Sequence, residues 1–185
     1  MKTLIINGSP RKNGDTTSLI EVFVNHLDGE YKIIDTYYCN IGPCIDCRYC
    51  WKNEGCSSKD GWTELHTYIL ECDNVVIASP IYFSELTGEL LSKMSKLQAY
   101  WAARFYRKEE IIKKKKKGGI ILVGGNDGSN EIPTETAKCL LDHMNANDIF
   151  DVVCSHNTDV VAAIDDEEAV GGAKKLADFF NEVTA

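Results

Sequence analysis

Five short runs of apolar residues, each rich in Ile and Val, recur along the chain and constrain its fold more than any other feature. They occupy residues 3–7, 31–36, 74–79, 119–123 and 149–154. Most of them lack strict alternation of apolar and polar residues, which is typical of strands that are buried on both faces. We therefore expect five β-strands in a sheet that is covered on both sides.

Helix-like patterns separate these runs, at residues 16–27, 61–72, 85–106, 133–146 and 166–183. In the first pattern Leu19, Ile20 and Phe23 fall on one face, as in an amphipathic helix. Asp165 and Asp166 predict a cap with acidic first-turn residues for the last helix. The alternation of strands and helices predicts a parallel sheet with helices on both faces.

The number of strands indicates which α/β fold with a parallel sheet is expected. Five strands in 185 residues fit a flavodoxin-like α/β fold, with strand order 2-1-3-4-5, better than a complete dinucleotide-binding fold. The length suits one domain with a sizeable core. We predict a single domain over residues 1–185, with a cysteine-rich insertion at about residues 39–59 that we refer to as the cysteine segment.

Charge and hydropathy limit the partners. The formal net charge of −8 argues against nucleic-acid binding, which needs a basic face. No apolar run approaches the roughly 20 residues that span a bilayer, so we expect no membrane partner. The first apolar run breaks at Gly8, too early for a signal peptide. We therefore expect a cytoplasmic protein with reduced thiols, and we interpret the basic run at residues 113–117 as a solvated stretch.

In sheets of this kind ligands bind at the carboxyl ends of the strands, which directs attention to the loops after residues 7, 79 and 123. The first loop, "NGSPRKNGDTTS", gathers hydroxyls and two cations where a helix begins, and free helix amides there bind anions. Because Asp15 follows Gly14, the P-loop pattern is absent, and so is G-x-G-x-x-G. The loop suits a phosphate that belongs to neither of those nucleotide classes. An ordinary helix with Asp15 as its N-cap is the alternative.

The other two loops suit a flat ring. In the second loop Ile81, Tyr82 and Phe83 place apolar and aromatic surface at a strand end, although the two aromatic rings could instead pack under the following helix. The third loop, "GGNDGSNE", has consecutive glycines that let the backbone approach a ligand, or it is a plain flexible loop. Together the three loops indicate one phosphorylated aromatic ligand, and FMN fits that description.

The motifs "LIINGSPRKNGDTTSL", "SPIYF" and "PCIDCRYC" resemble the NADPH-dependent FMN reductase-like family, and more narrowly its iron-sulfur flavoprotein branch. The resemblance covers essentially the whole chain and implies a flavodoxin-like fold, bound FMN and a homodimer or homotetramer. It also implies the FMN-binding residues: Ser9, Arg11, Asn13, Asp15, Thr16 and Thr17 for the phosphate, Pro80, Ile81, Tyr82 and Phe83 along the ring, and Gly124, Gly125 and Asn126 on the third side.

The chain departs from the pattern of this family at three places. An acidic pair often follows the cysteines, but here Lys59 and Asp60 stand there. An Asp-Arg pair often ends the turn of the third helix, whereas this chain has Lys96, Leu97 and Gln98, so subunit contacts there are expected to differ. Asp15 stands where Asn is common, and its carboxylate is unfavourable near a phosphate unless it faces away.

Five of the eight cysteines lie between residues 39 and 56. Cys44, Cys47, Cys50 and Cys56 read C-x2-C-x2-C-x5-C, and an iron-sulfur cluster takes four Cys ligands. The resemblance implies one [4Fe–4S] cluster on these four residues. A zinc site, disulfides and a segment of free thiols are the alternatives. Cys39 is interpreted as a buried or spare thiol. The cysteines at positions 72, 139 and 154 are predicted to be core thiols.

These features indicate an FMN-dependent oxidoreductase in which the cofactor carries the chemistry, so we assign no catalytic acid or base to the protein. With a cluster, single electrons would pass between a donor such as a ferredoxin and FMN. Without one, NAD(P)H would reduce FMN, and a quinone or free flavin would reoxidise it. A non-enzymatic alternative is a flavodoxin-like electron carrier or a thiol redox sensor.

Overall fold

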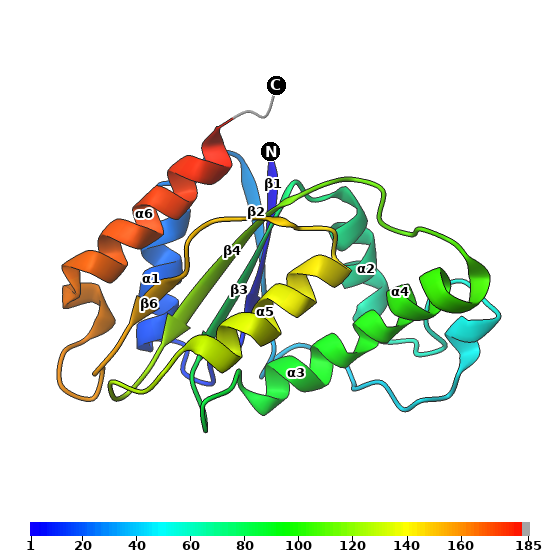
Figure 1. The fold of residues 1–185 in the computed structure, drawn as a ribbon, viewed down its shortest axis with the longest axis horizontal. Helices are drawn as coiled ribbons and strands as arrows, with labels where there is room; N and C mark the ends of the chain where they lie inside the picture. The colour runs from blue at the N-terminus through cyan, green and yellow to red at the C-terminus, as the bar shows by residue number, and fades with distance from the viewer. Residues whose placement is uncertain (183–185) are drawn as a thin grey trace.

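The computed structural model describes residues 1–182 and contains one parallel sheet. Its strands are β1 (Lys2–Asn7), β2 (Glu30–Asp35), β3 (Asn74–Pro80), β4 (Lys117–Val123), β5 (Asp148–Ile149) and β6 (Val153–Ser155). The order is β2-β1-β3-β4-β5, with β6 also paired to β4 (Figure 1). The flavodoxin-like order that the strand spacing predicts is therefore confirmed.

The fifth strand position differs from the prediction of one strand over residues 149–154, which is wrong. Two short strands pair side by side along β4, with Ile149 opposite Gly118 and Val153 opposite Ile121. The Phe150 N–H still donates to the Gly118 carbonyl of β4 at 3.0 Å, and the chain leaves the ladder after this residue. The Phe150 ring packs on Phe179, with centroids 5.4 Å apart. The interruption includes Asp151, which is exposed and is the one charged residue of the run.

Helices cover both faces of the sheet. They are α1 (Asp15–Val24), α2 (Trp62–Glu71), α3 (Gly88–Met94), α4 (Gln98–Ala102), α5 (Glu131–His143) and α6 (Glu167–Asn181), with short helical turns η1 (Tyr49–Trp51), η2 (Ser95–Leu97), η3 (Ala103–Arg107) and η4 (Ala163–Asp165). In Figure 1, α1 and α6 lie on one side of the sheet and α2 to α5 on the other. No helix within residues 1–182 is long and apolar enough to cross a membrane.

The long helix expected over residues 85–106 begins later and is less regular. It starts at Gly88 and continues through α3, η2, α4 and the π-helical turn η3 to Arg107, a stretch that we call the helical run. Residues 85–87 lie outside it, since Glu85 pairs with Tyr82 in a turn. The predicted cap at Asp166 is confirmed, because its carboxylate accepts two backbone N–H groups of the first turn of α6. The expected helix end at residue 183 lies outside the described residues.

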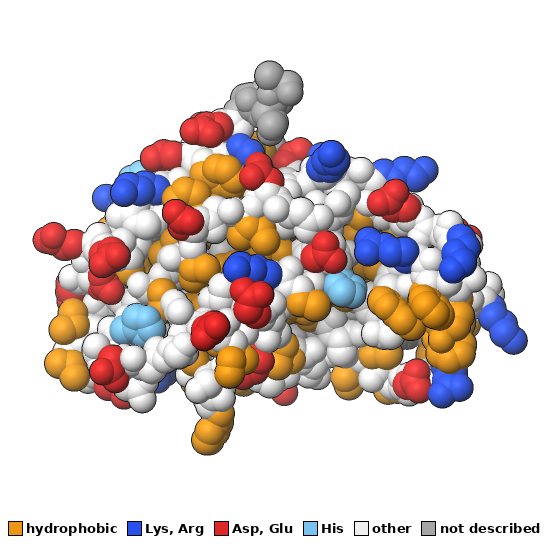
Figure 2. All heavy atoms as spheres, in the orientation of Figure 1, with side chains coloured by type: hydrophobic (Ala, Val, Ile, Leu, Met, Phe, Trp, Pro, Cys, Tyr) orange, Lys and Arg blue, Asp and Glu red, His pale blue; other side chains and the backbone are white. Residues whose placement is uncertain are grey.

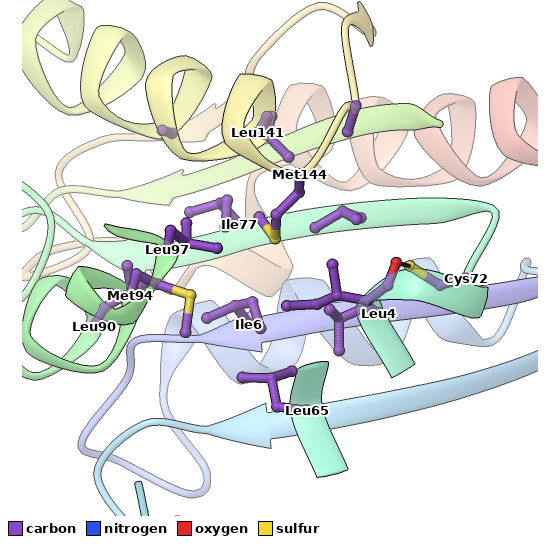
Figure 3. Packing of buried hydrophobic residues seen from close by; sticks show 14 of the residues in the cluster. Leu4, Ile6, Leu65, Cys72, Ile77, Leu90, Met94, Leu97, Leu141 and Met144 are labelled. Atoms are coloured by element: carbon purple, nitrogen blue, oxygen red, sulfur yellow. Dashed lines mark hydrogen bonds between the residues drawn. The ribbon is translucent and has the colours of Figure 1, made fainter. Parts of the chain in front are cut away.

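Alternate residues of β1 point to opposite faces and supply two cores, because side chains alternate along a strand. Ile5 packs with α1 and α6, whereas Leu4 and Ile6 belong to the core beneath α2, α3 and α5. Figure 3 shows Leu90, Met94 and Leu97 of the helical run, with Leu141 and Met144 from α5 and its end, directed at β1 and β3. Each such buried side chain contributes about 1.5–3 kcal/mol, so the helical run is firmly seated on the sheet.

The basic run is only partly solvated, contrary to the prediction. Lys116 and Lys117 are buried, and Lys117 begins β4. Its Nζ donates to the carbonyls of Phe179 and Glu182 at 2.5 and 2.8 Å, which ties the sheet to the end of α6. Burial lowers the pKa of Lys116, whose Nζ donates to the Lys114 carbonyl at 3.0 Å.

Candidate functional site

A cavity of about 470 Å³, which we call the strand-end cavity, opens at the carboxyl ends of β1, β3, β4 and β6. Its lining includes every predicted FMN-binding residue except Asn13 and Thr17. Asn13 is exposed, and the Thr17 hydroxyl donates to the Arg11 carbonyl at 3.2 Å. The strand-end rule therefore located the largest part of this cavity.

The first loop forms hydrogen bonds within itself, and the N-terminus of the helix that follows it is uncapped. The Ser9 N–H donates to Asn7 Oδ1 at 3.0 Å, and the Arg11 N–H donates to Ser9 Oγ at 3.2 Å. Helix α1 begins at Asp15, its N-cap is Gly14, and no side chain caps it. The alternative of an ordinary helix with Asp15 as its N-cap is therefore wrong. Uncapped first-turn N–H groups at this rim are suited to bind an anion.

The carboxylate of Asp15 is held by a different part of the chain. Its Oδ1 accepts the backbone N–H of Ala163, at 3.0 Å, from the turn that precedes α6. Asp15 nevertheless lines the strand-end cavity. Its role is therefore to join the first loop to the opposite rim, which the sequence could not show because the two residues are far apart along the chain.

The second loop is a tight turn that projects from β3. The Ile81 N–H donates to the Val123 carbonyl at 2.8 Å, and Tyr82 and Glu85 exchange backbone hydrogen bonds of 2.9 and 3.1 Å. Between them Phe83 and Ser84 have positive φ angles of 53° and 61°. The Phe83 side chain is fully exposed, so the alternative in which it packs under the following helix is wrong. An exposed aromatic ring in a strained turn indicates a functional constraint.

The third loop is bound to a fourth loop, which follows β6 and was not anticipated. The N–H groups of Thr158 and Asp159 donate to the carbonyls of Gly124 and Gly125 at 3.1 and 3.3 Å. A Cβ added to Gly125 would lie 2.8 Å from Asp159 Oδ2, so the glycine permits this contact. The lining residues that the sequence reasoning missed are Pro10, Gly14, Ser84, Val123, Gly128, Ser129, Thr158 and Asp159. Applying the strand-end rule to the fifth strand would have located the last two.

A second cavity, of about 220 Å³, is lined by Cys44, Cys47, Cys50 and Cys56, and we call it the cysteine cavity. It shares no lining residue with the strand-end cavity. Burial raises the pKa of the Cys50 thiol, and the three other thiols of the set raise it further. A hydrogen bond with the Ser57 hydroxyl, at 3.1 Å, lowers the pKa of Cys47. The sequence spacing therefore does bring these thiols to one place.

The four thiols surround this space without converging on one point. In residues 1–182, no three His, Cys, Asp or Glu side chains lie close enough together to hold a metal ion. Zinc, bound by thiolates at about 2.3 Å, would need such convergence. A four-iron cluster takes its four thiolates around a larger core. Four thiols around one cavity are the donor set that such a cluster takes.

The helical run holds the cysteine segment in place. The Cys44 N–H donates to Ser95 Oγ at 2.9 Å, and Arg107 donates to the carbonyls of Cys50 and Asn53. Asp60, after the last cysteine of the motif, pairs with Lys96 at 2.5 Å. Two of the departures from the family pattern are therefore partners in space.

Asp60 is unusually well supplied with donors. Its carboxylate accepts the N–H groups of Gly42 and Trp62, at 2.8 and 3.0 Å, in addition to the Lys96 ammonium. Burial opposes its ionisation, but these donors outweigh burial and hold the pKa of Asp60 well below its usual range. The carboxylate therefore remains charged in an almost closed environment.

The remaining cysteines have different surroundings. Cys72 is buried, as predicted, and Cys154 is half-buried beside His156, with 3.3 Å between Sγ and Nε2. Cys139 is exposed on α5, so its prediction as a core thiol is wrong, because its position falls on the outer face of that helix. Cys39 is half-buried and packs against the core.

Aromatic side chains are exposed at the far end of the helical run. Trp101 and Phe105 stack with centroids 4.9 Å apart, and Tyr106 stacks on Trp51 of the cysteine segment at 4.1 Å. Trp101, Phe105 and Tyr106 are 36%, 55% and 40% exposed. Figure 2 shows hydrophobic side chains gathered at the right-hand end of the molecule, with Lys and Arg side chains around them.

The sequence matches a family model described as NADPH-dependent FMN reductase over residues 1–159. It is 33% identical over 103 residues to an iron-sulfur flavoprotein of Methanocaldococcus jannaschii, which covers 54% of this chain and 52% of that protein. An iron-sulfur flavoprotein of Archaeoglobus fulgidus is 40% identical over 91 residues, which cover 48% and 44% of the two chains. The matched region spans about half the length of these curated relatives.

Solved structures show the same fold over essentially the whole chain. An NAD(P)H:quinone oxidoreductase from Methanothermobacter marburgensis superimposes with a TM-score of 0.75 at 14% identity, covering 100% of this chain and 99% of that one. An FMN-dependent NADH-azoreductase from Bacillus anthracis, in complex with FMN, gives a TM-score of 0.67 at 17% identity and covers 98% of each chain.

Proposed function

Since the chain belongs to the NADPH-dependent FMN reductase family, we propose that it is an FMN-dependent oxidoreductase that binds FMN in the strand-end cavity. The single observation that carries this proposal is the lining of that cavity. An uncapped helix start with Arg11 and hydroxyls lies on one side, a turn with aromatic side chains on the second, and a glycine loop on the third. This arrangement fits a phosphate, a flat ring and a close backbone approach.

The residues of the chain bind and orient, and FMN when bound supplies both hydride and single-electron transfer. The buried Thr16 hydroxyl and the first-turn amides of α1 would hold the phosphate, with Arg11 balancing its charge. Pro80 and Ile81 would lie along the ring, and Tyr82 with Phe83 would restrict access of water from the open side.

We further propose that the four cysteines of the cysteine cavity hold a [4Fe–4S] cluster, which would exchange single electrons with a donor such as a ferredoxin. Two observations support this assignment. The four thiols line one cavity, as the ligands of a single cluster must. Relatives matched over about half of the chain are named iron-sulfur flavoproteins.

A second function is an NAD(P)H-dependent FMN or quinone reductase without a cluster. The observation that favours it is that no three metal-binding side chains lie within reach of one ion in the described part of the chain. In this case NAD(P)H would donate hydride directly to the flavin, and a quinone would reoxidise it. The fold shared with an NAD(P)H:quinone oxidoreductase is compatible with both functions.

We also propose that the protein is a homodimer or homotetramer. The exposed aromatic side chains at the end of the helical run support this, since contiguous exposed apolar surface often marks an interface. Light scattering after size exclusion measures the subunit number. A monomer at all working concentrations would contradict the proposal.

The central experiment is purification without oxygen, followed by an absorbance spectrum and assays of FMN, iron and acid-labile sulfide per chain. Flavin bands with iron and sulfide support the proposed function, and flavin without iron after reconstitution supports the cluster-free reductase. Failure to bind FMN after reconstitution would overturn both. NAD(P)H oxidation with a quinone acceptor then separates an enzyme from a carrier, which would show almost no turnover.

Two substitutions locate the phosphate. Arg11→Ala and Thr16→Ala should each weaken FMN binding by about tenfold or more, because each removes a charged or hydroxyl partner of an anion. Lys12→Ala is the matched control, since Lys12 is the next residue along the chain, carries the same charge and is not part of the cavity lining. Equal FMN affinity in all three variants would mean that the phosphate binds elsewhere.

A further inference from the structure

We propose that Asp60 and Lys96 form a clasp that closes the cysteine segment and positions its thiols for the cluster. The inference deepens the proposed function and rests on the assignment of the cluster to the cysteine cavity. Neither residue is a predicted ligand, and both act through the geometry of the segment between them.

The first step is the closure of the segment. The Asp60 carboxylate accepts the N–H of Gly42, which precedes the first ligand, and the N–H of Trp62, which begins α2. Beside these bonds the Gly61 N–H donates to the Asn40 carbonyl at 2.7 Å. One carboxylate therefore joins the chain where it enters the ligand-bearing loop to the chain where it leaves.

The second step is the connection of this closure to the rest of the protein. Lys96 Nζ lies 2.5 Å from Asp60 Oδ2, and the lysine side chain is 1% exposed. Lys96 belongs to the helical run, whose neighbouring residues Met94 and Leu97 are buried in the core. The clasp therefore anchors the cysteine segment to a helical run that is itself packed on the sheet.

The third step is the cost of this pair. A buried lysine is rare, because the desolvation of both charges offsets much of their attraction, and an apolar pair of similar volume would often be equally stable. Lys96 is also part of the lining of the cysteine cavity, where four thiolates would concentrate negative charge. An apolar pair at this wall could not accept the N–H groups of Gly42 and Trp62, so it would leave the segment open at both ends.

The fourth step is that further bonds to the helical run act in the same direction. Ser95 Oγ accepts the N–H of Cys44, and Arg107 donates to the carbonyl of Cys50. The first and third cysteines of the motif are therefore held at their own backbone, while the clasp holds the ends.

The test compares the wild type with the Asp60→Asn/Lys96→Met double variant, which removes both charges and so avoids leaving one buried ion unpaired. Lys96→Arg tests rescue by a conserved charge, and Lys93→Met is the matched control, because Lys93 pairs with Glu89 on the same helical run. Each protein is reconstituted with iron and sulfide without oxygen. The measurements are iron and sulfide per chain and the affinity for FMN.

We expect the double variant to keep FMN affinity within about twofold, since its sites are remote from the strand-end cavity. Its affinity for iron should fall about tenfold or more, as for other groups that orient ligands. Lys96→Arg should recover iron binding, and Lys93→Met should resemble the wild type. Wild-type iron content in the double variant would overturn the proposal. A parallel loss of iron and FMN would also overturn it, by showing a general structural role.

A wild-type protein that assembles no cluster would refute the cluster assignment, and the clasp is then judged separately in the cluster-free protein. Backbone hydrogen exchange at Gly42 and Cys44 should be about tenfold faster in the double variant than in the wild type. Unchanged exchange at these two amides would overturn the clasp itself.

Discussion

The strand-end cavity and the cysteine cavity are built in different ways. Around the strand-end cavity, main-chain bonds join one loop to the next, as between Ile81 and Val123 and between Thr158 and Gly124. Around the cysteine cavity, irregular backbone is held by side chains of one helical run, namely Ser95, Lys96 and Arg107. The shape of the first cavity follows from the order of the strands, whereas the shape of the second depends on a few side chains.

Because of this difference, we expect a substitution at one cavity to have a different kind of effect from a substitution at the other. A side chain lost from the rim of the strand-end cavity should change ligand affinity while the rim keeps its shape, because backbone bonds hold it. A side chain lost from around the cysteine cavity should change the geometry of the candidate ligands, because few main-chain bonds hold this segment.

The largest expected effect comes from Lys96→Met alone. It leaves the Asp60 carboxylate, whose side chain is 15% exposed, without its cation, which should cost up to about 3–5 kcal/mol of unfolding free energy. Urea denaturation measures the cost, and FMN titration under native conditions should show little change. Lys93→Met, at a partly exposed pair, should cost no more than about 1 kcal/mol. Equal losses in the two variants would show that burial of the pair at Lys96 has no special importance.

A smaller effect in the opposite cavity is expected from Gly8→Ala. The added Cβ would lie 2.8 Å from Leu90 Cδ1 and 2.9 Å from Thr87 Oγ1, so either the first loop or these side chains must shift. We expect a loss of about 1–3 kcal/mol, together with weaker FMN binding and unchanged iron content. Gly88→Ala is the control, since nothing lies within 4 Å of its added Cβ. If Gly8→Ala lowered iron content as much as FMN affinity, the two cavities would not be independent.

Acidification gives a third test, at the cysteine cavity. The pKa of Asp60 is lowered in the folded protein, so the stability it contributes is present above its ordinary pKa of about 3.9 and is lost as the pH falls further. The unfolding free energy of Asp60→Asn should therefore depend less on pH than that of the wild type below about pH 4. Urea denaturation at a series of pH values measures both curves. If the unfolding free energies of the two proteins changed with pH in parallel, the folded protein would not lower the pKa of Asp60.

The smallest effect is a gain, at the turn of the strand-end cavity. Two-residue turns with positive φ at both central positions favour Asn-Gly, yet this chain has Phe83 and Ser84. The Phe83→Asn/Ser84→Gly variant should therefore gain about 1 kcal/mol in unfolding free energy, with iron content unchanged. If turnover with a quinone falls while stability rises, the strain serves the function. No gain in stability would show that the turn stores no strain.

Much of the architecture could be predicted because it depends on short-range patterns. The period and composition of the apolar runs indicated the strands, and the carboxyl-end rule then placed the loops of residues 7–18, 80–83 and 124–126 around one cavity. Features that depend on distant partners could not be predicted. Asp15 accepts the N–H of Ala163, and Lys117 donates to Phe179, in each case across the fold.

The cysteine segment combines a property that the sequence predicted with one that only the tertiary structure showed. The spacing of Cys44, Cys47, Cys50 and Cys56 by itself identified four candidate ligands, because short spacing keeps thiols near one another in any fold. Only the tertiary structure showed what holds them, since Asp60 and Lys96 are separated by 36 residues and meet through the packing of the helical run on the sheet. Local spacing determines which side chains can meet, and packing of distant segments decides which of them do.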